Sequence, residues 1–278
     1  MMIVLSHYQV APWLAARGQM DTLRTSLDLG RSEAEVRLEA AGVRLPGGEM
    51  LPWEAVAQVA EDSHGCYRLE GEQLVCIQAF SAHTGRAYSL YPTPAAPTLL
   101  VAGIPMHRIK GTDPWQDTLS KVRVANPRGW VLDTCMGLGY TAILAARTAE
   151  RVLTIELDAA VVAIARQNPW SQPLFDNPRI QIVIGDSADI LPALASGVFS
   201  CVIHDPPTFA LAGELYTLDF YREVYRVLRP RGRLFHYIGD PESKSGHAVT
   251  ARVRERLRQA GFQRLTPAPH AFGLLAGK

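Results

Sequence analysis

Hydrophobic and polar positions follow two different patterns along the chain and divide it into two regions. From about residue 124 onward, short apolar runs alternate with segments of helical periodicity, at the spacing of strand-helix-strand units. The expected strands lie at 130–132, 151–155, 180–184, 199–203 and 232–238, the clearest helices at 140–147 and 248–259, and a closing strand pair at 262–265 and 271–275. This order predicts a mostly parallel sheet covered by helices on both faces.

The residues before this region favour short strands. Positions 35–38 alternate between polar and apolar, 74–77 form an apolar run, 46–48 form a turn and 53–60 suit a short helix. Prolines at 92, 94 and 97 then stiffen the chain, and Asp113 before Pro114 is a good helix start. We therefore expect a small β-rich N-terminal domain at 1–95, a connector with a helix at 96–124, and the main α/β domain at 125–278.

Composition excludes several classes of protein. The 278 residues are 47% hydrophobic with a mean hydropathy of +0.01, enough for a substantial core in two domains. No apolar run approaches the roughly 20 residues that span a bilayer, so no membrane segment is expected. Residues 1–10 lack a basic start followed by a long apolar core, which predicts no signal peptide and a cytoplasmic location.

Cysteine spacing and charge narrow the picture further. The four cysteines, at 66, 76, 135 and 201, show no C-x-x-C spacing, so neither a metal site nor a disulfide framework is expected. The net charge of +1 gives no electrostatic footprint for nucleic acid. Arginine clusters at 222–233 and 252–258 suit helix C-termini and solvated helix faces, with a nucleic-acid surface as the alternative.

The clearest chemical signal is an acid followed by a glycine turn between a strand and a helix. Asp133 ends the first apolar run, and Gly137 and Gly139 allow the backbone to approach a ligand at the helix N-terminus. Residues 137–142 fit the loose dinucleotide pattern G-x-G-x-x-G/A, with Glu156 about 20 residues on. The carboxylate at 133 would repel a pyrophosphate but attract the ammonium and sulfonium of S-adenosylmethionine, so the charge favours that cofactor.

This pattern resembles the class I S-adenosylmethionine-dependent methyltransferases, whose first motif is an acid before a glycine-rich turn. Cys135 stands where many members have their first glycine. The resemblance implies a Rossmann-like sheet, mostly parallel with a closing antiparallel strand. It also implies a cofactor site that comprises the turn, ribose-binding residues after the second strand and adenine-binding residues after the third: Asp133, Thr134, Cys135, Met136, Gly137, Gly139, Glu156, Leu157, Asp186 and Ser187.

Each acid also has a purely structural interpretation. Asp133 and Asp186 suit helix N-caps, and Glu156 suits an ordinary surface position. Acids at the ends of three successive parallel strands nevertheless converge on the crevice where open α/β sheets bind ligands. The sequence therefore predicts a single site at these strand ends.

A loop after the fourth strand suggests the chemistry of the acceptor. Residues 205–209 are Asp-Pro-Pro-Thr-Phe, and two consecutive prolines make a loop rigid and expose its carbonyls. Such a loop resembles those of methyltransferases that act on planar exocyclic amines and of some ribosomal RNA methyltransferases. The resemblance implies that Asp205 and the Pro206 carbonyl accept the hydrogens of the amine and that Phe209 stacks on a heterocycle. The expected acceptor is RNA or a small-molecule amine.

A second resemblance competes with the first. Residues 213–221 and 227–232 resemble the segment after the catalytic aspartate of spermidine synthases, which are aminopropyltransferases on the same fold. That likeness implies Asp205 as base and Tyr216 near the amine, although the aromatic residues of 216–221 also suit a buried helix face. The turn Cys-Met-Gly-Leu-Gly differs from the Gly-Asp-Gly loop of those enzymes. His107, in the loop before the helix at 114, either faces the substrate or is an ordinary exposed residue.

The resulting hypothesis is an S-adenosylmethionine-dependent methyltransferase that modifies nitrogen of a nucleobase or a small-molecule amine. An aminopropyltransferase that uses decarboxylated S-adenosylmethionine is the alternative. A dehydrogenase and a non-enzymatic cofactor-sensing or RNA-binding protein remain open.

Overall fold

The computed structural model describes residues 2–240 and 244–278, and the chain forms two compact units. The first unit comprises Met1–Trp115 and Ala160–Gln172, and the second comprises Gln116–Ala159 and Pro173–Lys278. The chain therefore passes between the units three times. The division expected from the sequence has a single connector at 96–124, and the grouping of 160–172 with the N-terminal residues was not expected.

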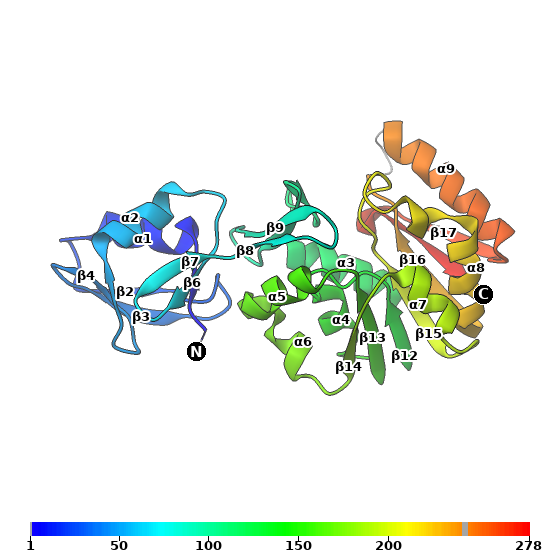
Figure 1. The fold of residues 1–278 in the computed structure, drawn as a ribbon, viewed down its shortest axis with the longest axis horizontal. Helices are drawn as coiled ribbons and strands as arrows, with labels where there is room; N and C mark the ends of the chain where they lie inside the picture. Colours follow the sequence, from blue (N-terminus) through cyan, green and yellow to red (C-terminus); the bar gives the residue numbers. More distant parts are fainter. Residues whose placement is uncertain (1, 241–243) are drawn as a thin grey trace. The chain divides into compact units, whose positions relative to one another are not determined.

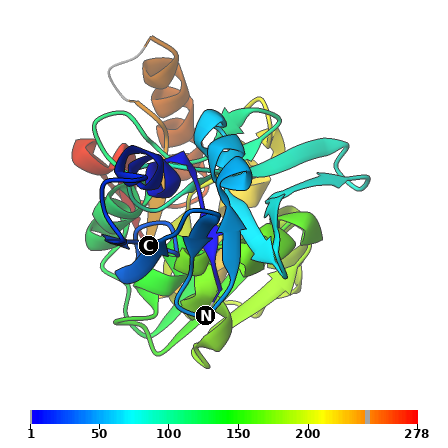
Figure 2. The same ribbon diagram turned by 90° about the vertical axis from the view of Figure 1, so that its left-hand side faces the viewer.

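The first unit contains three small antiparallel sheets (Figures 1 and 2). One sheet has the order β1-β6-β7, with strands Val4–Leu5, Tyr67–Glu70 and Gln73–Cys76. A second has the order β2-β3-β4-β5, with strands Thr22–Thr25, Ala34–Leu38, Gly42–Arg44 and Met50–Pro52. The third has the order β11-β10-β9-β8, with strands Ile104–Pro105, Thr98–Val101, Arg86–Tyr91 and Gln78–Ser81.

Two helices of this unit, α1 (His7–Ala16) and α2 (Trp53–Glu61), lie side by side (Figure 2). The Ser6 side chain accepts a hydrogen bond from the backbone of α1, which gives that helix a defined start. Trp13 and Val56 are fully buried and contribute to one apolar cluster, so the helices cover a core of their own. Helix α1 was not expected from the sequence, whereas α2 was.

The second unit is built on a seven-stranded sheet with the order β14-β13-β12-β15-β16-β18-β17 (Figure 1). The strands are β12 (Trp130–Asp133), β13 (Arg151–Glu156), β14 (Ile180–Ile184), β15 (Phe199–His204), β16 (Leu228–Tyr237), β17 (Arg264–Ala268) and β18 (Gly273–Gly277). Neighbouring strands from β14 to β16 pair in parallel, and β18 pairs antiparallel with both β16 and β17. The prediction of a Rossmann-like, mostly parallel sheet with a closing antiparallel strand is confirmed.

Helices follow most of these strands. They are α3 (Pro114–Ala125), α4 (Tyr140–Ala145), α5 (Ala159–Gln167), α6 (Gln172–Asp176), α7 (Ser187–Ala193), α8 (Leu218–Val227) and α9 (Lys244–Gln259), with short 3-10 turns η1 (Pro169–Ser171), η2 (Gly213–Tyr216) and η3 (Pro269–Ala271). Strand β16 and helix α9 both begin earlier in the chain than expected. Among the residues described, no helix has the length and apolarity needed to cross a membrane.

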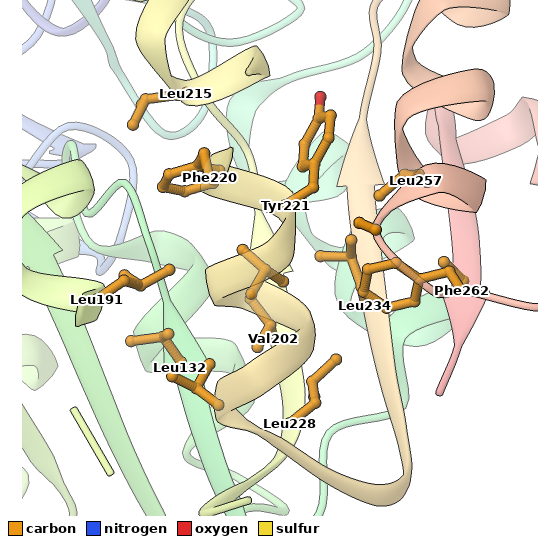
Figure 3. Packing of buried hydrophobic residues seen from close by; sticks show 14 of the residues in the cluster. Leu132, Leu191, Val202, Leu215, Phe220, Tyr221, Leu228, Leu234, Leu257 and Phe262 are labelled. Atoms are coloured by element: carbon orange, nitrogen blue, oxygen red, sulfur yellow. The ribbon is translucent and has the colours of Figure 1, made fainter. Parts of the chain in front are cut away.

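The core of the second unit explains why the central strands form where they do. Leu132, Val202 and Leu234 come from three adjacent strands, are fully buried, and pack in one cluster with residues of α8 and α9 (Figure 3). Side chains alternate between the faces of a strand, so Cys201 lies on the opposite face from Val202. Its Sγ is 3.8 Å from the Ala125 carbonyl oxygen, which places the end of α3 on that opposite face.

Candidate active site

The turn after β12 has the backbone geometry that the sequence predicted. Gly137 and Gly139 have φ values of +53° and +78°, in the left-handed region that favours glycine. The Met136 amide donates to the Ile155 carbonyl at 2.8 Å and ties the turn to β13. Helix α4 begins directly after Gly139, so its N-terminal amides and the turn lie together at the carboxyl end of the sheet.

Asp133 ends β12 and is completely buried. The Thr154 hydroxyl donates to its Oδ2 at 2.8 Å and the Cys135 amide also favours the ionised carboxylate, whereas its Oδ1 has no hydrogen bond of good geometry among the described residues. Burial raises the pKa of Asp133 from 3.8 to about 8. An unsatisfied buried carboxylate oxygen is costly, and a ligand ammonium would satisfy it. The site therefore fits the ammonium of an adenosyl sulfonium cofactor.

Glu156 ends the next strand and reaches back to the same turn. Its Oε2 accepts the Gly137 amide at 2.8 Å and its Oε1 accepts the Asp158 amide at 3.1 Å. These bonds hold the carboxylate in place, and burial raises its pKa to about 7. Each oxygen keeps acceptor capacity for a ribose hydroxyl. The next residue, Leu157, exposes 37% of its surface, so an apolar side chain lies beside this carboxylate.

Asp186 and Ser187 join the end of β14 to the turn. Asp186 accepts the Ala188 amide at 2.7 Å and caps α7, which is the structural interpretation considered for this acid. The Ser187 hydroxyl donates to the Thr134 carbonyl at 2.6 Å. This bond places the start of α7 next to the residue that follows Asp133, so the predicted ribose and adenine segments both adjoin the turn.

Two neutral histidines lie beneath the turn and were not anticipated from the sequence. His204 Nε2 donates to the Leu215 carbonyl at 3.1 Å, and its Nδ1 accepts the Thr134 hydroxyl at 2.7 Å. His236 Nδ1 donates to the Tyr237 carbonyl, and its Nε2 accepts the Tyr221 hydroxyl at 2.9 Å. Burial lowers the pKa of both imidazoles, that of His236 to about 3. The only sequence signal was their position at the ends of two apolar strands.

Asp205 follows β15 and forms an ion pair that sequence reasoning missed. Its Oδ2 lies 2.7 Å from Nζ of Lys121 on α3, and that ammonium lies 2.9 Å from Oδ2 of Asp117 one turn earlier. Lys121 and Asp117 are buried, whereas the Asp205 side chain is 14% exposed. The Lys121 ammonium also lies 4.1 Å from the centre of the Tyr237 ring.

The two prolines and the aromatic residues of the loop are also fixed in position. The Tyr216 hydroxyl donates to the Pro207 carbonyl at 2.8 Å, so this side chain anchors the loop. Tyr216 is buried, and its ring meets the Phe209 ring edge-on at 5.6 Å. Phe209 is 49% exposed, which leaves its ring accessible to a ligand. Pro206 is buried.

The structure groups most of the predicted site residues at one edge of the sheet. Asp133 and Asp205 are close enough that the charge of Asp205 adds to burial in raising the pKa of Asp133. Cys135 is partly exposed in the same turn, and burial raises the pKa of its thiol, as expected for a packed cysteine. His107 belongs to the first unit, where its Nδ1 lies 2.9 Å from the Thr98 hydroxyl. In the described part of the chain, no cluster of three His, Cys, Asp or Glu side chains has metal-ligand geometry.

Comparison with known proteins agrees with this site. A family model described as a methyltransferase domain matches residues 131–232, which include the glycine turn and the Asp205 loop. An uncharacterized protein of Methanocaldococcus jannaschii, MJ1233, is 38% identical over 267 residues, which cover 94% of this chain and 91% of that protein. This match extends through both units.

Enzymes of polyamine chemistry are more distant relatives. A polyamine aminopropyltransferase of Aeropyrum pernix is 33% identical over 101 residues, or 34% of this chain and 32% of that enzyme. Putrescine N-methyltransferase 4 of Nicotiana tabacum is 28% identical over 141 residues, or 48% of this chain and 36% of that enzyme. Each alignment covers only about a third of the relative.

Solved structures share the fold. Spermidine synthase in complex with the transition-state analogue AdoDATO aligns with a TM-score of 0.61 and 19% identity, over 72% of each chain. Spermidine synthase from Thermotoga maritima aligns with a TM-score of 0.58 and 18% identity, over 77% of this chain and 74% of that one. The matches together support a transferase of the methyltransferase or aminopropyltransferase type. The chain therefore belongs to the family of the Methanocaldococcus jannaschii protein MJ1233, it contains a region that matches a methyltransferase domain, and it shares the fold of spermidine synthase.

Proposed function

We propose that this protein transfers a methyl group from S-adenosylmethionine to the nitrogen of a small-molecule amine. The observation that supports this most directly is the buried Oδ1 of Asp133, which has no partner among the described residues. A phosphate-bearing dinucleotide would place negative charge against this oxygen, whereas an ammonium satisfies it. The adenosyl donor supplies, when bound, a methyl carbon that is activated by positive sulfur.

In this proposal the chain binds and orients the two partners and does not need a strong base. Asp133 takes the ammonium of the donor, Glu156 its ribose hydroxyls, and Asp186 its adenine amino group. Asp205 and the Pro206 carbonyl accept the N–H groups of the acceptor, and Asp205 receives the proton that the nitrogen loses. Phe209, half exposed beside this loop, packs against the body of the acceptor.

The polyamine enzymes among the relatives favour an aliphatic amine as the acceptor. One of them is named for methyl transfer to putrescine, and another for aminopropyl transfer to polyamines. The carboxylates at the strand ends suit a cationic acceptor as well as a cationic donor. We therefore propose a diamine or polyamine as the first class of acceptor to test and a nucleobase as the second.

The first experiment measures donor binding and its linked proton. We expect S-adenosylhomocysteine, which keeps the ammonium, to bind the protein and to release a proton from Asp133 near pH 7. Calorimetry in two buffers of different ionisation enthalpy measures that release. Glu156→Ala should weaken the binding of S-adenosylhomocysteine at least about tenfold, because the variant loses the proposed contacts to the ribose. A loss of this size is expected for a charge-assisted hydrogen bond. Glu150→Ala, at an exposed acid before the opposite end of β13, is the control. Failure of the wild-type protein to bind would reject the proposal.

The second experiment identifies the acceptor. Methyl-labelled S-adenosylmethionine is incubated with the protein and putrescine, spermidine, free nucleosides or total RNA, and the fractions are separated. Label in a di- or polyamine supports the proposal, whereas label in RNA or nucleosides moves the acceptor to the nucleobase class. Donor binding without any label transfer would point to a cofactor-sensing protein.

An aminopropyltransferase is the alternative, because two spermidine synthase structures share the fold over 72% and 77% of the chain. The Asp133 carboxylate suits both donors, since each has an ammonium. The same assay with decarboxylated S-adenosylmethionine decides between them. Formation of an aminopropylated amine together with no methyl transfer would establish the alternative.

A further inference from the structure

Lys121 is the least expected feature of the site, because a lysine side chain is rarely buried. Its side chain is 1% exposed on α3, yet its ammonium contacts two carboxylates, Asp205 at 2.7 Å and Asp117 at 2.9 Å. Burial alone would lower the pKa of Lys121, but these carboxylates outweigh burial and raise it. The ammonium is therefore charged, and the three side chains together have a net charge of about −1.

The network has a direction. Asp117 is completely buried, Lys121 nearly so, and Asp205 is 14% exposed, so the ion pairs extend from the interior of the unit to the start of the Asp205 loop. Lys121 also packs its ammonium against the Tyr237 ring at 4.1 Å, which fixes its position from the β16 side. The Asp205 carboxylate is thus contacted on its interior side by groups that are themselves buried.

The groups around Asp205 show why a nearby ammonium matters for its charge. Charged and titratable groups reach it from α3, β12 with its turn, η2 and β16: Lys121, Asp117, Asp133, Cys135, Tyr216 and Tyr237. Apart from Lys121, all of these groups are neutral or negative. Without the lysine, Asp205 would lie near Asp133 with little solvent and no neighbouring cation, and its own pKa would rise.

We propose that Lys121 is a positioning residue of the transfer reaction, which holds the Asp205 carboxylate ionised and fixed at the entrance of the Pro206-Pro207 loop. This inference rests on the proposed function, in which Asp205 binds the acceptor nitrogen. Asp117 limits the effect, because it competes for the same ammonium. Replacing Lys121 and replacing Asp117 should therefore shift the ionisation of Asp205 in opposite directions.

The first test reads Asp205 directly and needs no acceptor. The protein is labelled with carbon-13 at its aspartate carboxyl groups and saturated with S-adenosylhomocysteine. The carboxyl signals are then followed by NMR as the pH is changed. The signal that is absent from the spectrum of Asp205→Asn belongs to Asp205. In Lys121→Met the midpoint should rise by about 1–3 pH units, the range for a carboxylate that loses a neighbouring cation. In Asp117→Asn it should fall, and in Lys121→Arg it should stay near the wild-type value.

The second test reads the reaction. With saturating donor and putrescine, or the amine that the label experiment identifies, the acid limb of kcat/KM for the acceptor should shift with the NMR midpoint in each variant. Affinity for S-adenosylhomocysteine should stay within about twofold. A purely structural ion pair would lower the melting temperature and leave the acid limb in place, which would contradict the inference.

The two proposals fail in different ways. Absence of methyl transfer to any acceptor counts against the proposed function, while the NMR midpoints still test the link between Lys121 and Asp205. If the protein transfers methyl groups but the NMR titration midpoint of Asp205 is unchanged in Lys121→Met, the inference about Lys121 is overturned. The proposed function is not contradicted by that result. If Lys121→Met does not fold, Asp117→Asn decides alone, and a midpoint that rises or stays constant contradicts the inference.

Discussion

At the scale of single residues, the site depends on carboxylates that folding makes expensive to ionise. Asp133 and Glu156 have pKa values raised to about 8 and about 7 because both are buried at the ends of adjacent strands. Each carboxylate is only partly compensated by hydrogen bonds from the protein, namely from Thr154 to Asp133 and from two backbone amides to Glu156. In the proposed function a cationic donor supplies the missing compensation, and ligand binding is then linked to proton release.

Asp133→Asn tests this linkage through stability. The protonated carboxyl stabilises the fold fully below the unfolded pKa of about 4, and this contribution is lost as the pH rises through the folded value of about 8. Without ligand, the wild type should therefore lose stability relative to Asp133→Asn between pH 5 and pH 9. The difference between their free energies of unfolding should change by on the order of a few kcal/mol in favour of the variant. Denaturant titrations across this range measure the gap.

The control for that experiment is Asp189→Asn, at an exposed acid in the first turn of α7. The difference in stability between this variant and the wild type is the reference for the Asp133→Asn curve. At high pH, saturating S-adenosylhomocysteine should restore the free energy of unfolding of the wild type. It should leave that of Asp133→Asn unaffected. A constant gap for Asp133→Asn would show that the buried carboxyl does not titrate in this range.

Sequence pattern identified the residues to which the proposal assigns donor binding, but not the buried groups that contact them. Acids at strand ends and glycines in a strand-to-helix turn stand out in a linear sequence, and the structure places them at one edge of the sheet. Lys121 did not stand out, since Asp117 and Lys121 form the i,i+4 pair that is typical of exposed helix faces. The available signal was their helical phase, which matches that of the buried Thr118, Val122 and Ala125.

At the scale of elements, the short turn η2 fixes the geometry of the reacting loop. Tyr216 on η2 donates its hydroxyl to the Pro207 carbonyl, and its own carbonyl accepts Arg256 of α9 at 2.6 Å. The loop is therefore connected to the helical layer over β15 and β16. The spermidine synthase likeness implies Tyr216 near the amine, which stays a prediction; in the structure its hydroxyl bonds to the Pro207 carbonyl and its ring is buried.

Tyr216→Phe removes the hydroxyl and keeps the ring. Loss of one buried hydrogen bond should cost about 1 kcal/mol of stability. The amides of Leu211 and Ala212, which bond to the Thr208 carbonyl, should exchange faster with solvent. Hydrogen exchange read by mass spectrometry measures this change. Tyr225→Phe, at the other end of α8, is the control, and equal exchange in the two variants would mean that η2 does not anchor the loop.

Prediction of elements succeeded where one periodicity dominated. The central strands β12, β13 and β15 of the large sheet are mostly buried, and their apolar runs mark them almost to the residue. The N-terminal region was harder, because its strands are short and half exposed, as the alternating burial of β2 and β7 shows. Prolines suggested a plain connector, yet Pro92, Pro94 and Pro97 lie between β9 and β10, and Pro105 lies on an edge strand that tolerates it.

At the scale of the whole molecule, residues 160–172 belong with the first unit although they lie within the sequence of the second. Specific bonds hold them there. Trp170 Nε1 donates to the Leu29 carbonyl at 3.0 Å, and Arg31 donates to the Pro169 carbonyl at 2.7 Å. The Trp170 ring also meets the Trp115 ring at 5.3 Å. No periodicity in the sequence signals such a pairing, because it joins residues about 140 positions apart.

Trp170→Phe tests the attachment of this segment. The variant keeps an aromatic ring and loses the donor to Leu29, so we expect a stability loss of about 1 kcal/mol. Hydrogen exchange should rise at Ser171 and nearby amides, while the amides of β15 stay protected. Arg37→Met, on the exposed side of β3, is the control. Unchanged exchange around Ser171 would show that these bonds do not hold the segment.

The three passages of the chain between the units limit how such a protein changes during evolution. A domain that is joined to the rest of a protein at one point can be exchanged by a single recombination. Here, replacing the N-terminal part with that of another protein would leave residues 160–172 without the residues to which they bond. Both parts are then inherited as one piece. The alignment with the Methanocaldococcus jannaschii protein, which continues across all three passages, is what shared descent of the intact arrangement would produce.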